Sequence, residues 1–401
     1  MDESQQTHAA ELSDKSRDSV LLHLAYPLWR KHLLVGVARA KELQDEGHDV
    51  TVTYCDATNG TCAANYFSNP VVCKICRTRA KATGEQAGLN LVPLSVAAAE
   101  SSSSVSASET EQLTEGVQSG ITSAFRSLPD DTSTSSFIQS TKRRYLQTSC
   151  ALLRSMKGVV QAVRPSRIEV FSGRHACSRF ALLAARAAQI PFNTLEITIT
   201  KRPIVFRGHT PHDRKQIQRR IQTHPVDIEF ADAFYRKRRQ PGGNRHTKGQ
   251  VQTFTPPVSD GYRKKVAIFL SSQDEFEALG RDWKSSFDDY ANVVAELCEE
   301  NPDTLFCIRF HPNQGEMTSD VVSPFDRVRG CKNVHLYLPD DTVNTYHLIE
   351  WSDTVITFGS TVTVEACWMG KPVILLGRSF FDGLGVAYVP ESMDEALALL
   401  K

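Results

Sequence analysis

Several features that would define a function class are missing from this 401-residue chain. Lys plus Arg and Asp plus Glu both number 46, so the net charge is zero and no bulk attraction to nucleic acid is expected. No apolar run approaches the roughly 20 residues that a membrane-spanning helix needs. The segment Met1–Asp18 is polar and lacks the apolar core of a signal peptide. We therefore expect a disordered tail at residues 1–18 of a cytoplasmic protein.

The chain has ten cysteines, and their spacing separates them into two groups. Six are scattered through apolar patterns and are expected to be small buried side chains. The other four cluster as Cys55, Cys62, Cys73 and Cys76, and the last two form a CxxC pair. In a reducing compartment this cluster is open to three interpretations: a structural zinc site, an iron–sulfur cluster or free thiols.

Hydrophobic periodicity predicts an α/β protein in which strands and helices alternate. In the first half, strands are expected at 19–25, 49–54, 89–94, 167–171 and 192–196, with helices at 33–45, 142–163, 178–189 and about 213–222. The opening βαβ pattern is typical of a doubly wound sheet. Residues 95–139 are rich in Ser, Thr and Ala and are expected to form a loop or a loosely packed helical insertion.

The composition changes near residue 236, where a basic run is followed by Pro241, Gly242 and Gly243. We interpret residues 236–261 as a linker between a domain at 19–235 and a second domain at 262–401. The run could also contact anionic lipid, although a solvated linker is the simpler interpretation. Beyond it, strands are expected at 265–270, 305–310, 333–338, 353–358 and 373–376, with helices at 287–301, 342–351, 362–369 and 393–401.

Two short motifs in the second domain point to an anion site. The strand 353–358 leads through Gly359, Ser360 and Thr361 into a helix, and the strand 305–310 ends at His311 before Pro312-Asn313. A glycine turn with hydroxyls before a helix presents backbone N–H groups to a phosphate. Each residue also has a plainer explanation: His311 as a surface histidine, and the two hydroxyls as helix N-caps. Together they favour a nucleotide bound at the carboxyl ends of parallel strands.

These motifs resemble those of the GT-B glycosyltransferases, in which two Rossmann-like doubly wound domains face each other across a cleft. Within that group, the chain is similar to bacterial capsule and surface-polysaccharide biosynthesis proteins. The similarity lies in residues 271–280, 309–313, 358–366 and 370–374. The His-Pro and Ser-Thr motifs also resemble those of Kdo transferases and sialyltransferases, which use CMP-sugars.

The resemblance implies roles for individual residues. His311, Gly359, Ser360 and Thr361 would hold the donor phosphate, and Glu365 would accept ribose hydroxyls. A second set of residues would contact other parts of the donor or an anionic acceptor: Ser272, Glu275, Arg309 and Arg174. The base that deprotonates the acceptor hydroxyl would be Glu196 first and His175 second, since both end predicted strands.

The resulting hypothesis is an inverting glycosyltransferase that moves a hexosyl, Kdo or sialyl group from a CMP- or NDP-sugar to a surface polysaccharide or lipid-linked glycan. Because no DxD-type pair is evident, we expect no metal or cofactor for the chemical step, although the cysteines could hold structural zinc. We expect a cytoplasmic protein, with peripheral contact to the inner membrane or an assembly complex. A UDP-sugar 2-epimerase and a non-catalytic scaffold are the alternatives. The terminal helical pattern leaves open that the chain is short, since in GT-B proteins such a helix often crosses back to the first domain.

Overall fold

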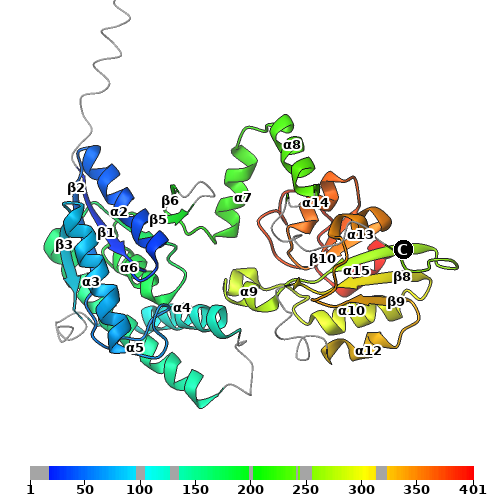
Figure 1. Cartoon of the computed structure of the whole chain (residues 1–401), viewed down its shortest axis with the longest axis horizontal. Coiled ribbons are helices and arrows are strands. Elements are labelled where there is room, and N and C mark those ends of the chain that lie inside the picture. The colour runs from blue at the N-terminus through cyan, green and yellow to red at the C-terminus, as the bar shows by residue number, and fades with distance from the viewer. Residues whose placement is uncertain are drawn as a thin grey trace, which may run out of the picture. The chain divides into compact units, whose positions relative to one another are not determined.

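A computed structural model of the protein describes residues 18–95, 104–126, 135–197, 202–240, 243, 255–312 and 323–401. The expected tail at 1–17, most of the linker after residue 240, and Asn313 of the His-Pro-Asn motif lie outside these ranges. The chain divides into two compact units, Met1–Asp213 and Arg214–Lys401. Each unit is an α/β layer structure around its own sheet (Figure 1).

The first unit contains a six-stranded sheet in the order β3-β2-β1-β4-β5-β6. Its strands are β1 (Ser19–Leu24), β2 (Asp49–Cys55), β3 (Asn90–Leu94), β4 (Arg167–Phe171), β5 (Phe192–Ile197) and β6 (Pro203–Arg207). The first five run parallel, and β6 pairs antiparallel with β5. The chain builds outward from β1 in both directions, so the strand order reverses between β1 and β4.

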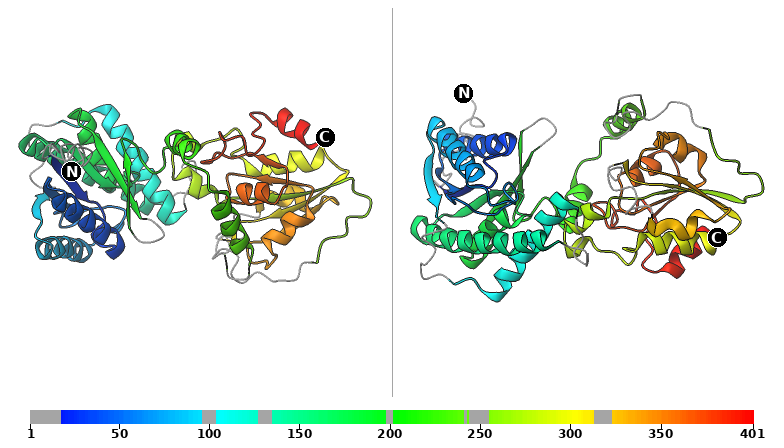
Figure 2. Two further views of the ribbon diagram at one scale, coloured as in Figure 1. Left: turned by 90° about the horizontal axis from the view of Figure 1, so that it is seen from above. Right: turned by 60° about the horizontal axis from the view of Figure 1, so that its bottom comes forward.

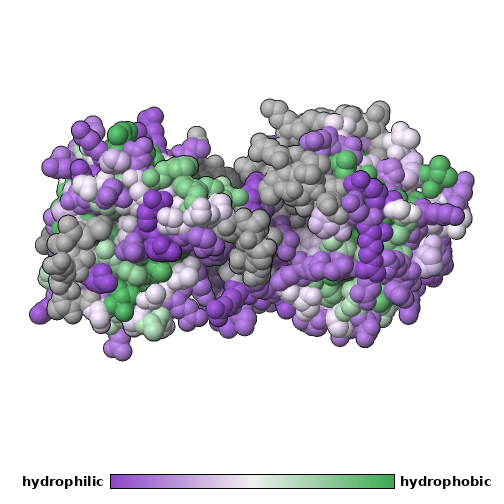
Figure 3. Space-filling view, turned by 90° about the horizontal axis from the view of Figure 1, so that it is seen from below, coloured by the Kyte–Doolittle hydropathy of each residue, from purple (hydrophilic) through white to green (hydrophobic). Residues whose placement is uncertain are grey.

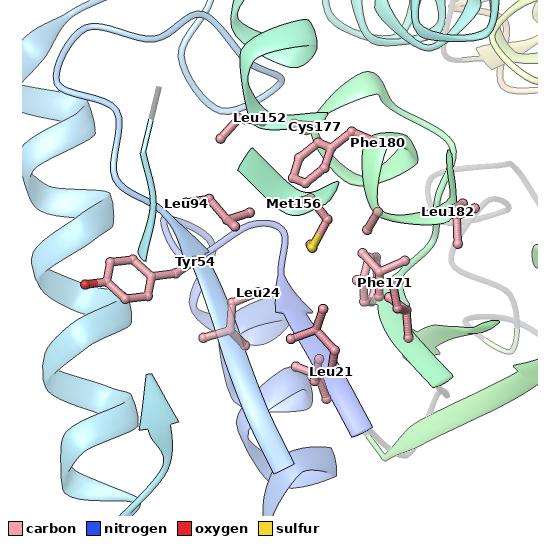
Figure 4. Packing of buried hydrophobic residues seen from close by; sticks show 14 of the residues in the cluster. Leu21, Leu24, Tyr54, Leu94, Leu152, Met156, Phe171, Cys177, Phe180 and Leu182 are labelled. Atoms are coloured by element: carbon pink, nitrogen blue, oxygen red, sulfur yellow. The ribbon is translucent and has the colours of Figure 1, made fainter. Parts of the chain in front are cut away.

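Both faces of this sheet are covered because successive side chains of a strand point to opposite sides. From β1, Leu22 and Leu24 face Gly36 of α2 (Arg30–Asp45), whereas the ring of His23 contacts Phe180 of α6 (Ala176–Ala187). Figure 2 shows helices on both sides of the sheet. The core they form is close-packed, and Figure 4 shows part of it around Leu21, Met156 and Phe180.

The other helices of this unit are α3 (Pro70–Gln86), α4 (Ala107–Phe125) and α5 (Ser136–Val163). The expectation of a loose insertion at 95–139 is wrong for α4, because Leu113, Val117 and Ile121 of this helix are buried in the core. The Ser106 side chain accepts from the backbone N–H of Glu109, whose carboxylate accepts from Ser106 N, so a capping box starts the helix. The segments 96–103 and 127–134 lie outside the described residues.

The second unit contains a parallel five-stranded sheet in the order β11-β10-β7-β8-β9. Its strands are β7 (Lys264–Phe269), β8 (Thr304–Arg309), β9 (Val334–Tyr337), β10 (Thr354–Thr357) and β11 (Val373–Leu375). The strand order reverses between β7 and β10. This arrangement confirms the predicted α/β class with two Rossmann-like, doubly wound units, which is the composition of the GT-B fold.

Alternation along the strands again divides the core of this unit into two layers. Ile268 and Ile308 pack against α10 (Tyr290–Glu299), α12 (Asp326–Arg329) and α15 (Met393–Leu400). Phe269 and Cys307 face the other way, toward α13 (Thr345–Trp351) and α14 (Val362–Trp368). Figure 1 shows α10 and α12 on one side of the sheet and α13 and α14 on the other. A short helix, α9 (Gln273–Glu277), follows β7.

The basic run that was interpreted as linker is helical at its start. Residues 236–239 form the last turn of α8 (Ile228–Arg239), which follows α7 (Arg214–Thr223). Three arginines of the run are paired: Arg236 with Asp232, Arg238 with Glu365 and Arg239 with Glu350. The pairs of Arg238 and Arg239 connect α8 to the second unit, and the boundary between units falls at residue 213 rather than 235.

The ion pairs of the basic run bear on the idea of lipid contact, because paired arginines have less charge to offer a membrane. On the face shown in Figure 3, hydrophobic residues form separate groups among hydrophilic ones. Within the described ranges, no helix combines the length and apolar character that crossing a membrane requires. Contact with a membrane surface stays a prediction.

Candidate functional site

A pocket of about 490 Å³ lies in the second unit, where β7, β8 and β10 end. It is therefore at the carboxyl edge of the sheet and at the point where the strand order reverses, the usual ligand position in an open α/β sheet. The residues that line it come from the strand ends, α8, α9, α13, α14 and the loop after β11. They are Arg238, Phe269, Leu270, Ser271, Glu275, Phe276, Leu279, Trp283, Arg309, Phe310, His311, Pro312, Thr345, Gly359, Ser360, Thr361, Val362, Glu365, Ser379, Phe380 and Phe381.

The structure brings most of the candidate donor residues together in this pocket. Those that line it are His311, Gly359, Ser360, Thr361, Glu365, Glu275 and Arg309. Ser272 does not line it: its side chain is buried and donates to Asp274, while its neighbour Ser271 lines the wall. The two serines are adjacent in the sequence, and because successive side chains of extended backbone point to opposite sides, only one of them faces the pocket.

The turn at Gly359 needs glycine for two reasons. Its φ is +88°, which an L-residue rarely adopts, and an added Cβ would lie 2.6 Å from Phe276 Cζ and 2.7 Å from the carbonyl oxygen of Arg378. Next to it, Ser360 Oγ accepts from the backbone N–H of Val362 at 3.2 Å, so the capping role expected for this hydroxyl is present. Thr361 makes no capping bond through its side chain.

Arg309 supplies a cation in the wall of the pocket. Its side chain is buried, and Nη1 donates to the carbonyl oxygen of Val343 at 2.8 Å. Burial lowers the pKa of Arg309 to about 10, and the nearby Asp341 carboxylate acts in the opposite direction. The guanidinium therefore stays charged at neutral pH, where an anionic ligand group would compensate it.

Glu365 is almost fully buried and forms an ion pair with Arg238, whose Nε lies 3.0 Å from Glu365 Oε1. Nη2 of the same arginine donates to the same oxygen. Burial alone would lower the pKa of Arg238, but the Glu365 carboxylate raises it above its usual value. The sequence interpretation assigned Glu365 to ribose and treated Arg238 as part of a linker, so the pair itself was missed.

Aromatic side chains form a wall of the pocket that the sequence reasoning also missed. Phe276, Trp283, Phe380 and Phe381 line it, and the rings of Trp283 and Phe380 meet edge to face with centroids 4.9 Å apart. Such rings offer stacking surface to a planar base. The signal in the sequence is the pair Phe380-Phe381 a few residues after the apolar run 373–376, a place where binding loops are expected.

In the first unit, Arg174 and His175 follow β4 and are joined to Tyr26 after β1. Nη2 of Arg174 lies 3.0 Å from His175 Nε2, and the Tyr26 hydroxyl lies 3.3 Å from His175 Nδ1. Because a guanidinium only donates, Nε2 is the acceptor and the ring proton is assigned to Nδ1. Burial, with the neighbouring Arg174 charge, lowers the pKa of His175 to about 3. The imidazole is thus neutral and its free lone pair is occupied.

Glu196 lies in β5 of the same unit and differs from His175 in its electrostatics. Burial raises the pKa of this carboxyl, while the backbone N–H of Ile197 and the charge of Arg174 act to lower it. Its Oε1 accepts from Ile197 N at 2.9 Å. A carboxyl with a raised pKa is a better proton acceptor than one at its ordinary value. The assignment of the base to Glu196 or to His175 stays a prediction.

Cys55, Cys62, Cys73 and Cys76 line one small cavity of about 40 Å³, together with Cys177. Cys73 Sγ accepts from Asn65 Nδ2 at 3.2 Å. Across the described residues, no group of three or more His, Cys, Asp or Glu side chains is placed to hold a metal ion. The structural zinc therefore stays a prediction without support from this geometry, and none of the ten cysteines forms a disulfide.

The pocket lies inside a segment that matches a known family. Residues 258–396 match the family described as capsule polysaccharide biosynthesis protein. This confirms the resemblance inferred from the sequence for the carboxy-terminal part of the chain. Every pocket-lining residue except Arg238 lies within the matched range.

Two curated relatives match parts of the chain. Protein FixF of Sinorhizobium fredii is 29% identical over 178 residues, which cover 40% of this chain and 40% of FixF. The second relative is a Clostridium acetobutylicum protein named as a putative UDP-N-acetylglucosamine 2-epimerase. It is 28% identical over 115 residues, which cover 29% of this chain and 28% of that protein. The chain thus spans well under half the length of either relative.

Among solved structures, the chain is similar to Thermosulfurimonas dismutans KpsC, beta Kdo 2,4 transferase. The TM-score is 0.39 at 17% identity, over 58% of this chain and 75% of that chain.

Proposed function

We propose that this chain is a glycosyltransferase of surface-polysaccharide biosynthesis that takes its sugar from a nucleotide-activated donor. The observation that carries the proposal is the pocket at the strand-order reversal of the second unit, within the segment that matches the capsule polysaccharide biosynthesis family. The pocket combines hydroxyls and a histidine at one strand edge with a buried arginine, a buried carboxylate and an aromatic wall. The hydroxyls, the histidine and the arginine suit a phosphate, the carboxylate suits a ribose, and the aromatic wall suits a base.

In this proposal the donor phosphate contacts His311, Ser360 and Thr361, with the cation of Arg309 in the same pocket. These donors stabilise the negative charge that develops on the nucleotide as it leaves. Such electrostatic stabilisation is usually the largest single contribution to an enzyme's rate enhancement. The Glu365 carboxylate accepts a ribose hydroxyl. The chemical step needs no divalent metal in this scheme, because protein groups neutralise the leaving phosphate.

The first unit would supply the acceptor side of the reaction. Glu196 would take the proton from the acceptor hydroxyl as that oxygen attacks the anomeric carbon, which inverts its configuration. Arg174 would bind an anionic group of the acceptor. The acceptor itself would be a growing surface polysaccharide or a lipid-linked glycan, and the donor a CMP- or other NDP-sugar.

The test is a binding panel of CMP, CDP, UDP and GDP on the wild type and on His311→Ala, measured by calorimetry and thermal shift. We expect one nucleotide to bind with a clear preference and to weaken in His311→Ala. His335→Ala is the matched control, because His335 is exposed on β9 outside the pocket. Absence of binding by all four nucleotides to the wild type would contradict the proposal and favour a non-catalytic scaffold.

An epimerase is the second candidate, favoured by the match to the Clostridium acetobutylicum protein. The two reactions differ in what they consume, since an epimerase converts UDP-N-acetylglucosamine without an acceptor. Incubating the protein with UDP-N-acetylglucosamine alone and resolving the sugar products by NMR separates them. Formation of the 2-epimer without added acceptor would replace the transferase proposal.

A further inference from the structure

Arg238 lies outside the segment that matches the capsule family, yet its side chain lines the pocket. We propose that Arg238 is a positioning residue of the donor site: it holds the Glu365 carboxylate so that one oxygen stays available for the ribose hydroxyls of the nucleotide. The inference rests on the proposed function and deepens it, because it names a residue that makes the site selective for ribonucleotides.

The helix that carries Arg238, α8, is anchored on α13 and α14 by several contacts. The rings of Tyr235 and Trp368 stack with centroids 5.7 Å apart, and Trp368 Nε1 donates to Asp232 Oδ1 at 3.2 Å. Arg239 pairs with Glu350, and its guanidinium lies 6.0 Å from the centre of the Trp368 ring. These contacts involve the face of α8 that carries residues 232, 235 and 239, so the helix delivers Arg238 to the same side.

The way Arg238 meets Glu365 leaves half of the carboxylate available. Both Nε and Nη2 of Arg238 donate to Oε1 of Glu365. Within the part of the chain that the structure describes, Oε2 of Glu365 receives no hydrogen bond, although Glu365 is only 4% exposed. Glu365 lines the pocket, so a ligand hydroxyl there can donate to this oxygen.

Arg238 is itself held on two sides, because the Tyr346 hydroxyl and Glu365 both interact with it. Its side chain is 23% exposed, so the ion pair is shielded from solvent more than a surface pair. Without Arg238, the Glu365 carboxylate would lose the two donors that hold it and be free to rotate. This change would remove the oriented acceptor that a ribose diol needs.

The experiment compares a ribonucleotide with its 2′,3′-dideoxy analogue, using the nucleotide that the binding panel selects. In the wild type we expect the dideoxy analogue to bind about 10-fold to 100-fold more weakly, the range for a hydrogen bond to a charged group. In Arg238→Ala and in Glu365→Gln we expect the ribonucleotide to weaken toward the dideoxy analogue, so the two ligands bind alike. Arg238→Lys keeps the charge with a different donor geometry and should retain part of the discrimination.

Arg236→Ala is the matched control, because Arg236 is on the same helix, its side chain is 71% exposed and it pairs with Asp232. It should discriminate between the ligands as the wild type does. An Arg238→Ala protein that is folded by circular dichroism and still discriminates fully would overturn the inference, as would tighter ribonucleotide binding by that variant. A wild type that binds no nucleotide contradicts the proposed function itself, so the two failures are distinguishable.

Discussion

Arg174 donates to the imidazole of His175, with Nη2 3.0 Å from Nε2, and burial together with this neighbouring cation keeps the histidine neutral. The Tyr26 hydroxyl on the other ring nitrogen is in turn 3.3 Å from Ser178 Oγ, and Ser178 Oγ donates to the carbonyl oxygen of His175 at 3.0 Å. His175, which follows β4, is therefore a poor proton acceptor, whereas burial raises the pKa of Glu196 on the neighbouring strand β5.

The first prediction concerns the base. Glu196→Gln should lower kcat by a factor of about 100 to 10,000, the usual contribution of a general base, and leave nucleotide binding unchanged. Because the base must be deprotonated and burial raises the pKa of Glu196, the wild-type kcat/KM should rise with pH through that raised value. His175→Gln should keep this pH profile. A profile that is lost in His175→Gln and kept in Glu196→Gln would reverse the assignment.

The second prediction concerns acid stability. Burial lowers the pKa of His23 to about 3, against about 6.5 in the unfolded chain. The unfolded state therefore binds more protons below pH 6.5, so the free energy of unfolding should fall as pH drops from 6.5 toward 3, by up to about 1.4 kcal/mol per pH unit. His23→Leu should flatten this slope in urea titrations at pH 7, 6 and 5. An equal slope in the variant would contradict the prediction.

The third prediction concerns a buried ion pair. Glu169 on β4 has a fully buried side chain, and it accepts from Arg39 Nε at 2.9 Å and from Asn193 Nδ2 at 3.0 Å. Glu169→Gln should lower the free energy of unfolding by about 3–5 kcal/mol, because Arg39 and Arg167 would both lose the buried carboxylate and Arg39 would keep only its exposed partner Glu42. Glu42→Gln, which removes the exposed partner of Arg39, should cost less than about 1 kcal/mol. Similar losses of unfolding free energy in Glu169→Gln and Glu42→Gln, measured by urea denaturation, would contradict the prediction.

The fourth prediction concerns the turn at Gly359. Gly359→Ala should weaken nucleotide binding and lower the thermal stability for two reasons. The new Cβ would lie 2.7 Å from the Arg378 carbonyl oxygen, and alanine would be strained at a positive φ. Gly370→Ala isolates the strain, because Gly370 has φ +74° and nothing within 4 Å of an added Cβ. We expect the Gly359 variant to lose more than the Gly370 variant by both measures.

The fifth prediction concerns the cysteine cavity. Burial raises the pKa of Cys55 to about 12 and that of Cys76 to about 11, so few thiolates form at pH 7. These thiols should react with a maleimide far more slowly in the folded protein than in urea, because the thiolate is the nucleophile. Elemental analysis of the same sample tests the zinc hypothesis. One zinc per chain, lost in Cys73→Ser, would require a rearrangement of the cavity.

The sequence by itself predicted every strand of the two sheets except β6, and most of the longer helices, because these depend on local periodicity and on glycine and proline at their ends. It also placed His311, Gly359 and Ser360 correctly at one edge, since the carboxyl ends of parallel strands must meet there. It did not predict α3 or α8. The helix α4 was not predicted from the sequence. Its apolar residues Leu113, Val117 and Ile121 recur at helical spacing and are buried, but they are surrounded by serine, threonine and alanine.

Only the tertiary structure decided which partners these residues meet. Arg238 and Glu365 are separated by 127 positions, and nothing local in a basic run indicates that one of its arginines enters a pocket. The neutral state of His175 likewise depends on burial and on the orientation of its neighbour Arg174, which sequence spacing does not encode. Burial and charge pairing are properties of the packed chain, and they turn residues of similar sequence context into groups with different chemistry.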